Sequence, residues 1–181
     1  MKDKGDKISF RKMVKEQEFE SIRELYCSAF PPEERREFQQ LVQLKDADGC
    51  DVLRIMNGNK PVGFCIVWFF EDFLFTEHFA IEPEWRGQGT GSRVLALLRE
   101  IYRRPVMLEV EPPCDEITSR RVSFYSRNGF YLLDRPYCQP SYGENKPEVV
   151  LRLMTSQAGL PPEKPEEYIA QIRKKVYRKE E

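Results

Sequence analysis

Residues 81–91 read Ile81-Glu82-Pro83-Glu84-Trp85-Arg86-Gly87-Gln88-Gly89-Thr90-Gly91, and a helix-like pattern of apolar residues follows directly. Three glycines at alternate positions leave a row of backbone N–H groups that no side chain covers. The N-terminus of a helix also carries a partial positive charge. The segment therefore predicts a binding site for a phosphate or pyrophosphate, at the start of a helix over residues 90–103.

Two common phosphate-binding motifs do not fit this loop. A Walker-type P-loop needs Gly-x-x-x-x-Gly-Lys-Ser/Thr, and no lysine follows these glycines. A dinucleotide-binding Gly-x-Gly-x-x-Gly motif is a better competitor, because Glu109 falls about where a ribose-binding acid should lie. However, Ser92 or Val94 stands where the third glycine belongs. The antiparallel hairpin expected upstream also does not suit a doubly wound sheet, so this motif is disfavoured as well.

Hydrophobic periodicity predicts a mixture of strands and helices along the rest of the chain. Residues 51–56 and 61–70 form an expected hairpin, because Asn57-Gly58 supplies the positive φ angles of a tight turn. Other strands are expected over residues 7–14, 73–81, 105–110, 130–133 and 148–154, and other helices over residues 16–30, 33–49 and 117–128. Residues 134–147 are expected to form a loop, and residues 157–181 a linker and a short amphipathic helix.

Three segments together resemble the GCN5-related N-acetyltransferase (GNAT) family. Residues 86–91 fit its Arg/Gln-x-x-Gly-x-Gly/Ala motif, and residues 79–87 (Phe-Ala-Ile-Glu-Pro-Glu-Trp-Arg-Gly) resemble the strand that leads into it. Residues 124–130 (Phe-Tyr-Ser-Arg-Asn-Gly-Phe) resemble the family's F-Y-x-x-x-G-F segment. The resemblance covers about residues 7–155. It implies an α/β (α+β) domain over residues 1–156, with a mixed, mostly antiparallel central sheet of about six to seven strands and helices on both faces.

The resemblance also implies acetyl-CoA as the acetyl donor, and the composition described below gives no reason to expect a metal. In the family, the strand end pairs with the pantetheine arm through its backbone, and the glycine loop wraps the pyrophosphate. Thr118 stands where many members have an asparagine that contacts the cofactor. The cofactor-binding residues implied by this match are Phe79, Ala80, Ile81, Arg86, Gly87, Gln88, Gly89, Thr90, Gly91, Ser92 and Thr118.

Two side chains are expected to carry the proton transfers. The family's match assigns Tyr125 the role of general acid toward the leaving thiolate, since a tyrosine with a pKa near 10 is protonated at neutral pH. Strand alternation places Glu77 on one face with Phe79 and Ile81, where desolvation should raise its pKa toward that of a useful base. His78, expected on the opposite face, is the second candidate for the base.

The predicted reaction moves an acetyl group from acetyl-CoA to a primary amine by direct attack in a ternary complex. The acceptor is a small-molecule amine or a peptide amine. In the family, the acceptor-binding site is shaped by segments equivalent to residues 30–36 and 136–142. Two alternatives stay open. The chain could be a catalytically silent acyl-CoA-binding regulatory module, or an N-acyltransferase that uses a longer acyl donor.

Composition excludes several other classes of protein. The formal net charge of −1 over 181 residues argues against a nucleic-acid partner, and a single histidine argues against a His-rich metal site. Five dispersed cysteines without a C-x-x-C pair indicate reduced thiols. The charged N-terminus has no apolar signal region, and the longest apolar run, Phe64–Phe70, is too short to span a membrane. We therefore expect a cytoplasmic protein, and its amphipathic tail is compatible with a homodimer.

Overall fold

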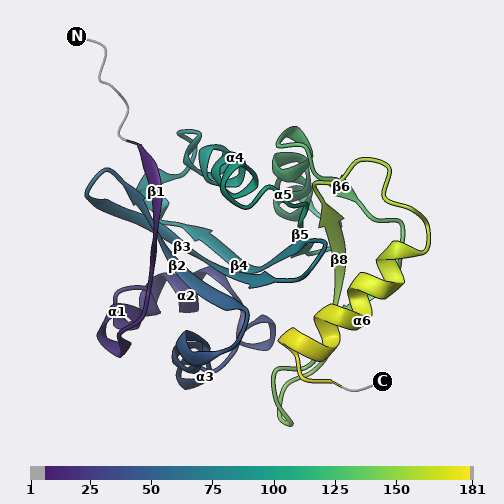
Figure 1. The fold of residues 1–181 in the computed structure, drawn as a ribbon, viewed down its shortest axis with the longest axis horizontal. Helices are drawn as coiled ribbons and strands as arrows, with labels where there is room; N and C mark the ends of the chain where they lie inside the picture. The colour runs from purple at the N-terminus through teal and green to yellow at the C-terminus, as the bar shows by residue number, and fades with distance from the viewer. Residues whose placement is uncertain (1–6, 180–181) are drawn as a thin grey trace.

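A hairpin lies at the centre of the computed structural model, which describes residues 7–179 (Figure 1). It joins β2 (Cys50–Asn57) to β3 (Lys60–Phe69), as the sequence predicted. Gly58 adopts a left-handed conformation with φ of 59° in the turn between them. The hairpin confirms the turn expected from Asn57-Gly58.

Within residues 7–179, eight strands form one sheet in the order β1-β2-β3-β4-β5-β8-β6, with β7 also paired to β8. The remaining strands are β1 (Ile8–Lys12), β4 (Leu74–Ile81), β5 (Val106–Val110), β6 (Tyr131–Leu132), β7 (Tyr137–Gln139) and β8 (Val149–Thr155). The mixed, mostly antiparallel sheet confirms the predicted fold. However, β7 lies in the segment that was expected to be a loop, because its three residues pair with the distant strand β8.

The parallel pair β4 and β5 positions the site. These two strands pair over three residues, from Leu74 opposite Val106 to Thr76 opposite Leu108. Just beyond this pairing, β4 carries a β-bulge, since Val67 of β3 is opposite Thr76 and Ile66 is opposite His78. An extra residue in one strand bends it away from its neighbour. The carboxyl ends of β4 and β5 are therefore free to separate.

Helices cover both faces of the sheet, as predicted (Figure 1). One face is covered by α4 (Thr90–Tyr102) and α5 (Glu116–Arg127), whose buried residues include Val94, Leu98 and Tyr125. The helices α1 (Glu16–Glu20), α2 (Arg23–Ala29), α3 (Phe38–Gln43) and α6 (Lys164–Val176) pack in the core on the other face. Short 3-10 turns are η1 (Pro32–Glu34), η2 (Leu44–Asp46) and η3 (Pro83–Trp85).

The two helices predicted near the N-terminus are shorter than expected. The expected helix over residues 16–30 is interrupted at Ser21 and Ile22, where the Ser21 hydroxyl donates to the Glu18 carbonyl (2.6 Å) and Arg54 donates to the Ser21 carbonyl (3.2 Å). These bonds compete with the helical ladder. The expected helix over residues 33–49 is limited to α3, between η1 and η2.

The amphipathic tail packs on the domain through α6, in agreement with its sequence pattern. Tyr168, Ile172 and Val176 are buried in the same core as the helices α1–α3. Two cationic side chains link the end of α6 to the rest of the domain. Lys175 Nζ donates to the Phe69 carbonyl (2.6 Å), and Arg36 Nη2 donates to the Val176 carbonyl (2.8 Å).

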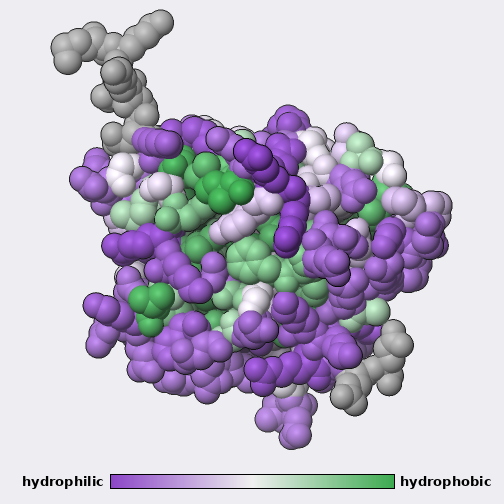
Figure 2. Space-filling view, viewed as in Figure 1, coloured by the Kyte–Doolittle hydropathy of each residue, from purple (hydrophilic) through white to green (hydrophobic). Residues whose placement is uncertain are grey.

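Figure 2 shows a mostly hydrophilic surface on which hydrophobic residues gather near the middle, over the central strands. Among residues 7–179, no helix combines the length and apolar character needed to cross a membrane.

Candidate functional site

A cavity of about 1360 Å³ lies where β4 and β5 separate. Its walls come from α2, η1, β4, β5, α5 and the glycine loop. Eight residues of the predicted site line it, namely Glu77, Phe79, Ala80, Ile81, Arg86, Gly87, Gly91 and Tyr125. The described lining does not include Gln88, Gly89, Thr90, Ser92 and Thr118. The fold thus brings the strand end, part of the glycine loop and the tyrosine of α5 to one space.

The glycine loop has the geometry of an anion-binding turn. Gly87 and Gly89 have φ angles of 71° and 77°, which an L side chain rarely adopts. A Cβ atom at either position would meet nothing within 4 Å, so the space in front of the loop is open. The first backbone bond of α4 runs from the Arg93 N–H to the Gly89 carbonyl (3.1 Å), which leaves the N–H groups of residues 90–92 without an intrahelical acceptor. These features fit the pyrophosphate of the implied donor.

Side chains on either side of the loop hold it in place. The Arg86 guanidinium donates to the Ile81 carbonyl (2.8 Å), and the Gln88 amide donates to the Glu84 carbonyl (2.7 Å). A Cβ on Gly91 would come within 3.0 Å of the Phe124 ring. A larger residue at position 91 would therefore require the Phe124 ring to shift slightly.

Tyr125 lies on α5 with its side chain in the cavity wall and is 8% exposed. Its ring contacts Phe124 and Phe130, with centroids 5.1 and 5.7 Å away. No hydrogen bond of its hydroxyl is found among residues 7–179. Burial raises the pKa of Tyr125 to about 12, so the hydroxyl keeps its proton at neutral pH. It can therefore donate a proton to a group in the cavity.

Thr118 forms its hydrogen bonds within the first turn of α5. Its backbone N–H donates to the Asp115 carboxylate (2.8 Å), and its hydroxyl accepts from the N–H groups of Cys114 and Asp115 (3.1 Å each). This arrangement is a capping box, which satisfies the free donors of the first turn. The structure thus gives Thr118 a local role in starting the helix that carries Tyr125.

The bulge in β4 changes which residues share a face. Ala80 joins the core under α2 and α3, whereas Phe79 and Ile81 pack with the core under α4. Glu77 contacts Arg36 and His78 contacts Glu34, so both side chains point to the α2–α3 side. The prediction that Glu77 shares a face with Phe79 and Ile81 is therefore wrong. An extra residue in the strand shifts the alternation by one position, which strict periodicity does not foresee.

Glu77 is a fully buried carboxylate with three donors. Arg36 Nε lies 2.7 Å from Oε1, Trp68 Nε1 lies 2.6 Å from Oε2, and the Tyr142 hydroxyl lies 2.8 Å from Oε1. Desolvation raises the pKa of Glu77, but Arg36, His78 and the donated hydrogen bonds outweigh it and leave the pKa below its ordinary value. The predicted rise in the pKa of Glu77 is therefore wrong, because the sequence pattern did not reveal Arg36 as its partner.

His78 is held as a neutral ring. Its Nε2 lies 2.9 Å from the Glu34 carbonyl and its ring packs edge-on against Phe30. Burial lowers the pKa of His78, although the nearby Glu77 opposes this. Its Nδ1 is buried without a hydrogen-bond partner in the described part of the chain. The ring thus lines the cavity, and its Nδ1 lies 3.8 Å from Glu77 Oε1.

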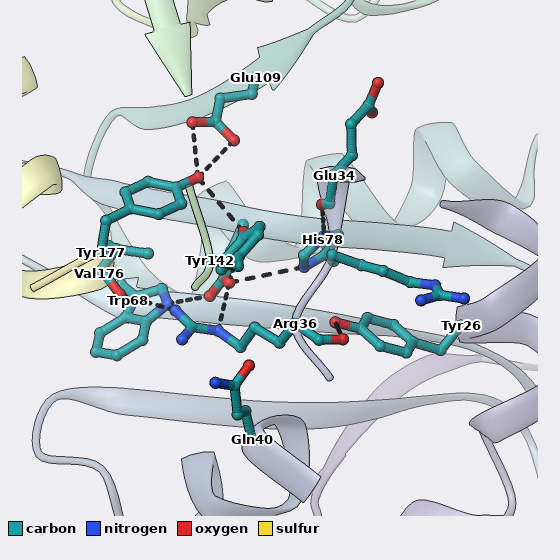
Figure 3. Close-up of polar contacts among 12 residues, drawn as sticks. Tyr26, Glu34, Arg36, Gln40, Trp68, His78, Glu109, Tyr142, Val176 and Tyr177 are labelled. Carbon is teal, nitrogen blue, oxygen red and sulfur yellow. Dashed lines mark hydrogen bonds and ion pairs between the residues drawn. The ribbon is translucent and has the colours of Figure 1, made fainter. Parts of the chain in front are cut away.

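Glu109 is an acid in the cavity that the sequence did not identify as catalytic. The hydroxyls of Tyr137 and Tyr177 donate to its carboxylate, and Tyr177 lies 2.8 and 2.9 Å from the two oxygens (Figure 3). Burial raises the pKa of Glu109 to about 8, and these two hydrogen bonds limit the rise. The signal that could have revealed it is a single acid between Leu108 and Val110 in an apolar strand.

Comparison with known proteins adds an independent finding. The sequence pattern of the acetyltransferase (GNAT) family matches residues 19–130. A Bacillus subtilis protein classed as an acetyltransferase, YjbC, is 36% identical over 63 residues, which are 34% of this chain and 32% of YjbC. The match thus spans about a third of the length of that curated relative.

Two solved structures extend the comparison to most of the chain. A protein of Bacteroides thetaiotaomicron described as a GNAT-family acetyltransferase is 33% identical, with a TM-score of 0.89 over 95% of this chain and 99% of its own. A GNAT-family acetyltransferase of Elizabethkingia anophelis, solved with acetyl-CoA bound, is 14% identical, with a TM-score of 0.56 over 84% of this chain and 99% of its own. The second likeness is one of fold.

Proposed function

The chain belongs to the acetyltransferase (GNAT) family, and we propose on this premise that it transfers an acetyl group from acetyl-CoA to a primary amine. The observation that carries the proposal is the open glycine loop at the start of α4, next to a cavity lined by Tyr125. The amine attacks the thioester directly in a ternary complex. The acceptor is a small-molecule or peptide amine.

The donor is held mainly by backbone groups. The free N–H groups of the glycine loop bind the pyrophosphate, and the end of β4 at Phe79, Ala80 and Ile81 pairs with the pantetheine arm. Because β4 and β5 separate beyond Thr76, the backbone groups at this strand end lie beside the cavity. Such contacts orient the thioester, and orientation supplies much of the rate in a direct transfer.

Glu109 and Tyr125 divide the proton transfers. Glu109 accepts a proton from the substrate ammonium, directly or through a water molecule, since its pKa of about 8 makes it a stronger base than Glu77. The free amine nitrogen then attacks the carbonyl carbon and forms the carbon–nitrogen bond, the carbon–sulfur bond breaks, and Tyr125 donates its proton to the sulfur. The nitrogen releases its second proton, which returns through water to the Tyr125 oxygen. Glu77, held ionised by Arg36, is a weaker base and serves to position its neighbours.

Calorimetric titration with acetyl-CoA tests the donor site. We expect micromolar binding to the parent protein and at least tenfold weaker binding to Gly89→Glu, which adds a negative charge at the pyrophosphate site. Gly89→Ala is the matched control, because it imposes the same left-handed strain, on the order of 1 kcal/mol, without the charge. We expect it to retain most of the affinity. Equal losses in the two variants would assign the effect to the backbone, and no binding to the parent would refute the proposed function.

Tyr125→Phe is expected to lower kcat about 10- to 100-fold while the affinity for acetyl-CoA stays unchanged. The change removes the proton donor but keeps the ring that packs on Phe124 and Phe130. Steady-state rates with an amine acceptor, together with calorimetry, separate the two effects. Tyr102→Phe, a change on α4 outside the cavity, is the control. A Tyr125→Phe variant with full kcat would exclude Tyr125 as the acid.

A further inference from the structure

The C-terminal segment reaches the candidate base. Tyr177 follows α6 directly, is 7% exposed, and directs its hydroxyl at both oxygens of Glu109 (2.8 and 2.9 Å; Figure 3). Tyr177 and Glu109 are 68 positions apart in the sequence. A hydroxyl within hydrogen-bond distance of both oxygens restricts the rotation of the carboxylate. It also stabilises the negative charge of the ionised form.

We propose that Tyr177 is a positioning residue of the acetyl-transfer site, which orients the Glu109 carboxylate and sets the pH at which it works. The inference rests on the proposed function, in which Glu109 is the base. It also makes α6 a functional part of the enzyme, because α6 carries Tyr177 to the site.

Arg36 fixes the position of Tyr177 relative to the sheet. Its Nε binds Glu77 (2.7 Å), while its Nη2 binds the carbonyl of Val176 (2.8 Å), the residue before Tyr177. A guanidinium that bridges two partners in this way is a rigid connector. The end of α6 is thereby tied to β4, next to the strand that carries Glu109.

Tyr142 completes a chain of polar contacts between Glu77 and Glu109. Its hydroxyl lies 2.8 Å from Glu77 Oε1 and 3.4 Å from the Tyr177 hydroxyl. Tyr142 and Tyr177 also line a second cavity of about 410 Å³.

The titratable groups around Glu109 determine in which direction its pKa changes when the Tyr177 hydroxyl is removed. Tyr137 of β7 and Tyr177 donate to it and lower its pKa, whereas the charges of Glu77 on β4 and Glu34 on η1 raise it. Removing the Tyr177 hydroxyl takes away one lowering contribution. The pKa of Glu109 should therefore rise further above its ordinary value, and a larger share of the carboxyl should be protonated at pH 7.

The tyrosines of this arrangement lie outside the part of the chain that matches the family. The family pattern ends at residue 130, whereas Tyr137, Tyr142 and Tyr177 all follow it. The match to the family pattern therefore does not by itself imply these three tyrosines.

Tyr177→Phe tests the inference, because it keeps the ring and removes only the hydroxyl. In a pH profile of kcat/KM, we expect the limb that rises with Glu109 ionisation to move up by about one pH unit, which is a loss of about tenfold at pH 7. Tyr168→Phe, on α6 but without a hydrogen bond to either acid, is the matched control and should leave the limb in place. Tyr137→Phe should move the limb in the same direction as Tyr177→Phe.

A second readout does not depend on activity. In protein labelled with ¹³C at glutamate side-chain carbons, with the Glu109 signal assigned through Glu109→Gln, the titration of Glu109 should move up in Tyr177→Phe. An unchanged titration of Glu109 in Tyr177→Phe, or an equal shift in Tyr168→Phe, would overturn the inference. Failure of the parent to transfer acetyl to any amine would refute the proposed function instead, whatever the titration shows.

Discussion

Replacing Arg36 by methionine is expected to lower the free energy of unfolding by about 3–5 kcal/mol at pH 7, because the change leaves a buried charge without its partner. The Glu77 side chain has 0% exposure and that of Arg36 has 14%, so water replaces little of the lost interaction. The variant also loses the hydrogen bond to the end of α6 at Val176. Urea unfolding of the parent and the variant measures the difference.

The double variant Arg36→Met/Glu77→Gln is the matched control. With both charges removed, no unpaired ion remains, and we expect the loss to be smaller than in Arg36→Met alone. If the double variant is at least as unstable as the single one, packing and the Val176 contact would explain the effect in place of the ion pair.

The stability difference between the parent and Arg36→Met should depend on pH. In the parent, the folded-state pKa of Glu77 lies below its ordinary value of 4.5, so its contribution is present above that value and is lost as the pH falls through the lower folded pKa. In Arg36→Met, desolvation acts without the cation and raises the pKa of Glu77. The variant should therefore recover stability relative to the parent as the pH is lowered from 7 to 5. A constant difference over that range would contradict this account.

Local signals in the sequence were sufficient for the donor side of the site. The start of α4 at Thr90, the turn at Gly58 and the helix that carries Tyr125 depend on glycines, caps and short-range periodicity. Such features are set by neighbouring residues, so a pattern in the chain predicts them. The positive φ angles of Gly87 and Gly89 are of the same kind.

The acceptor side depends on contacts between distant segments. The bulge opposite Val67 follows from the pairing of β4 with β3, and it moved Glu77 and His78 to the same face. Arg36 reaches Glu77 across 41 positions and Tyr177 reaches Glu109 across 68. In the sequence, Glu77 and Glu109 look alike, because each is an acidic residue in an apolar strand. Their different pKa directions arise from whether the fold brings a cation or only hydroxyls to the buried carboxylate.

Glu109→Gln is expected to lower kcat/KM about 10²- to 10⁴-fold at the pH optimum of the parent, which is the usual contribution of a general base. The amide keeps the size of the side chain and an oxygen that accepts from Tyr177, so the cavity wall should stay in place. Affinity for acetyl-CoA should not change, because in the proposed site the glycine loop at the start of α4 binds the pyrophosphate and Glu109 does not. Rates across pH 6–10 and calorimetry measure both quantities.

The pH profile and the stability of Glu109→Gln separate catalysis from structure. The limb that follows a pKa of about 8 in the parent should be absent in the variant. A carboxyl whose folded pKa lies above its ordinary value penalises folding as the pH rises, so removing the carboxylate should keep or increase stability at pH 9. Glu111→Gln, at another acid that lines the cavity but is paired with Arg121, is the matched control and should lose less than threefold in rate. If Glu109→Gln keeps both its rate and the limb, the proton must leave by another route, and the assignment of the base to β5 would be wrong.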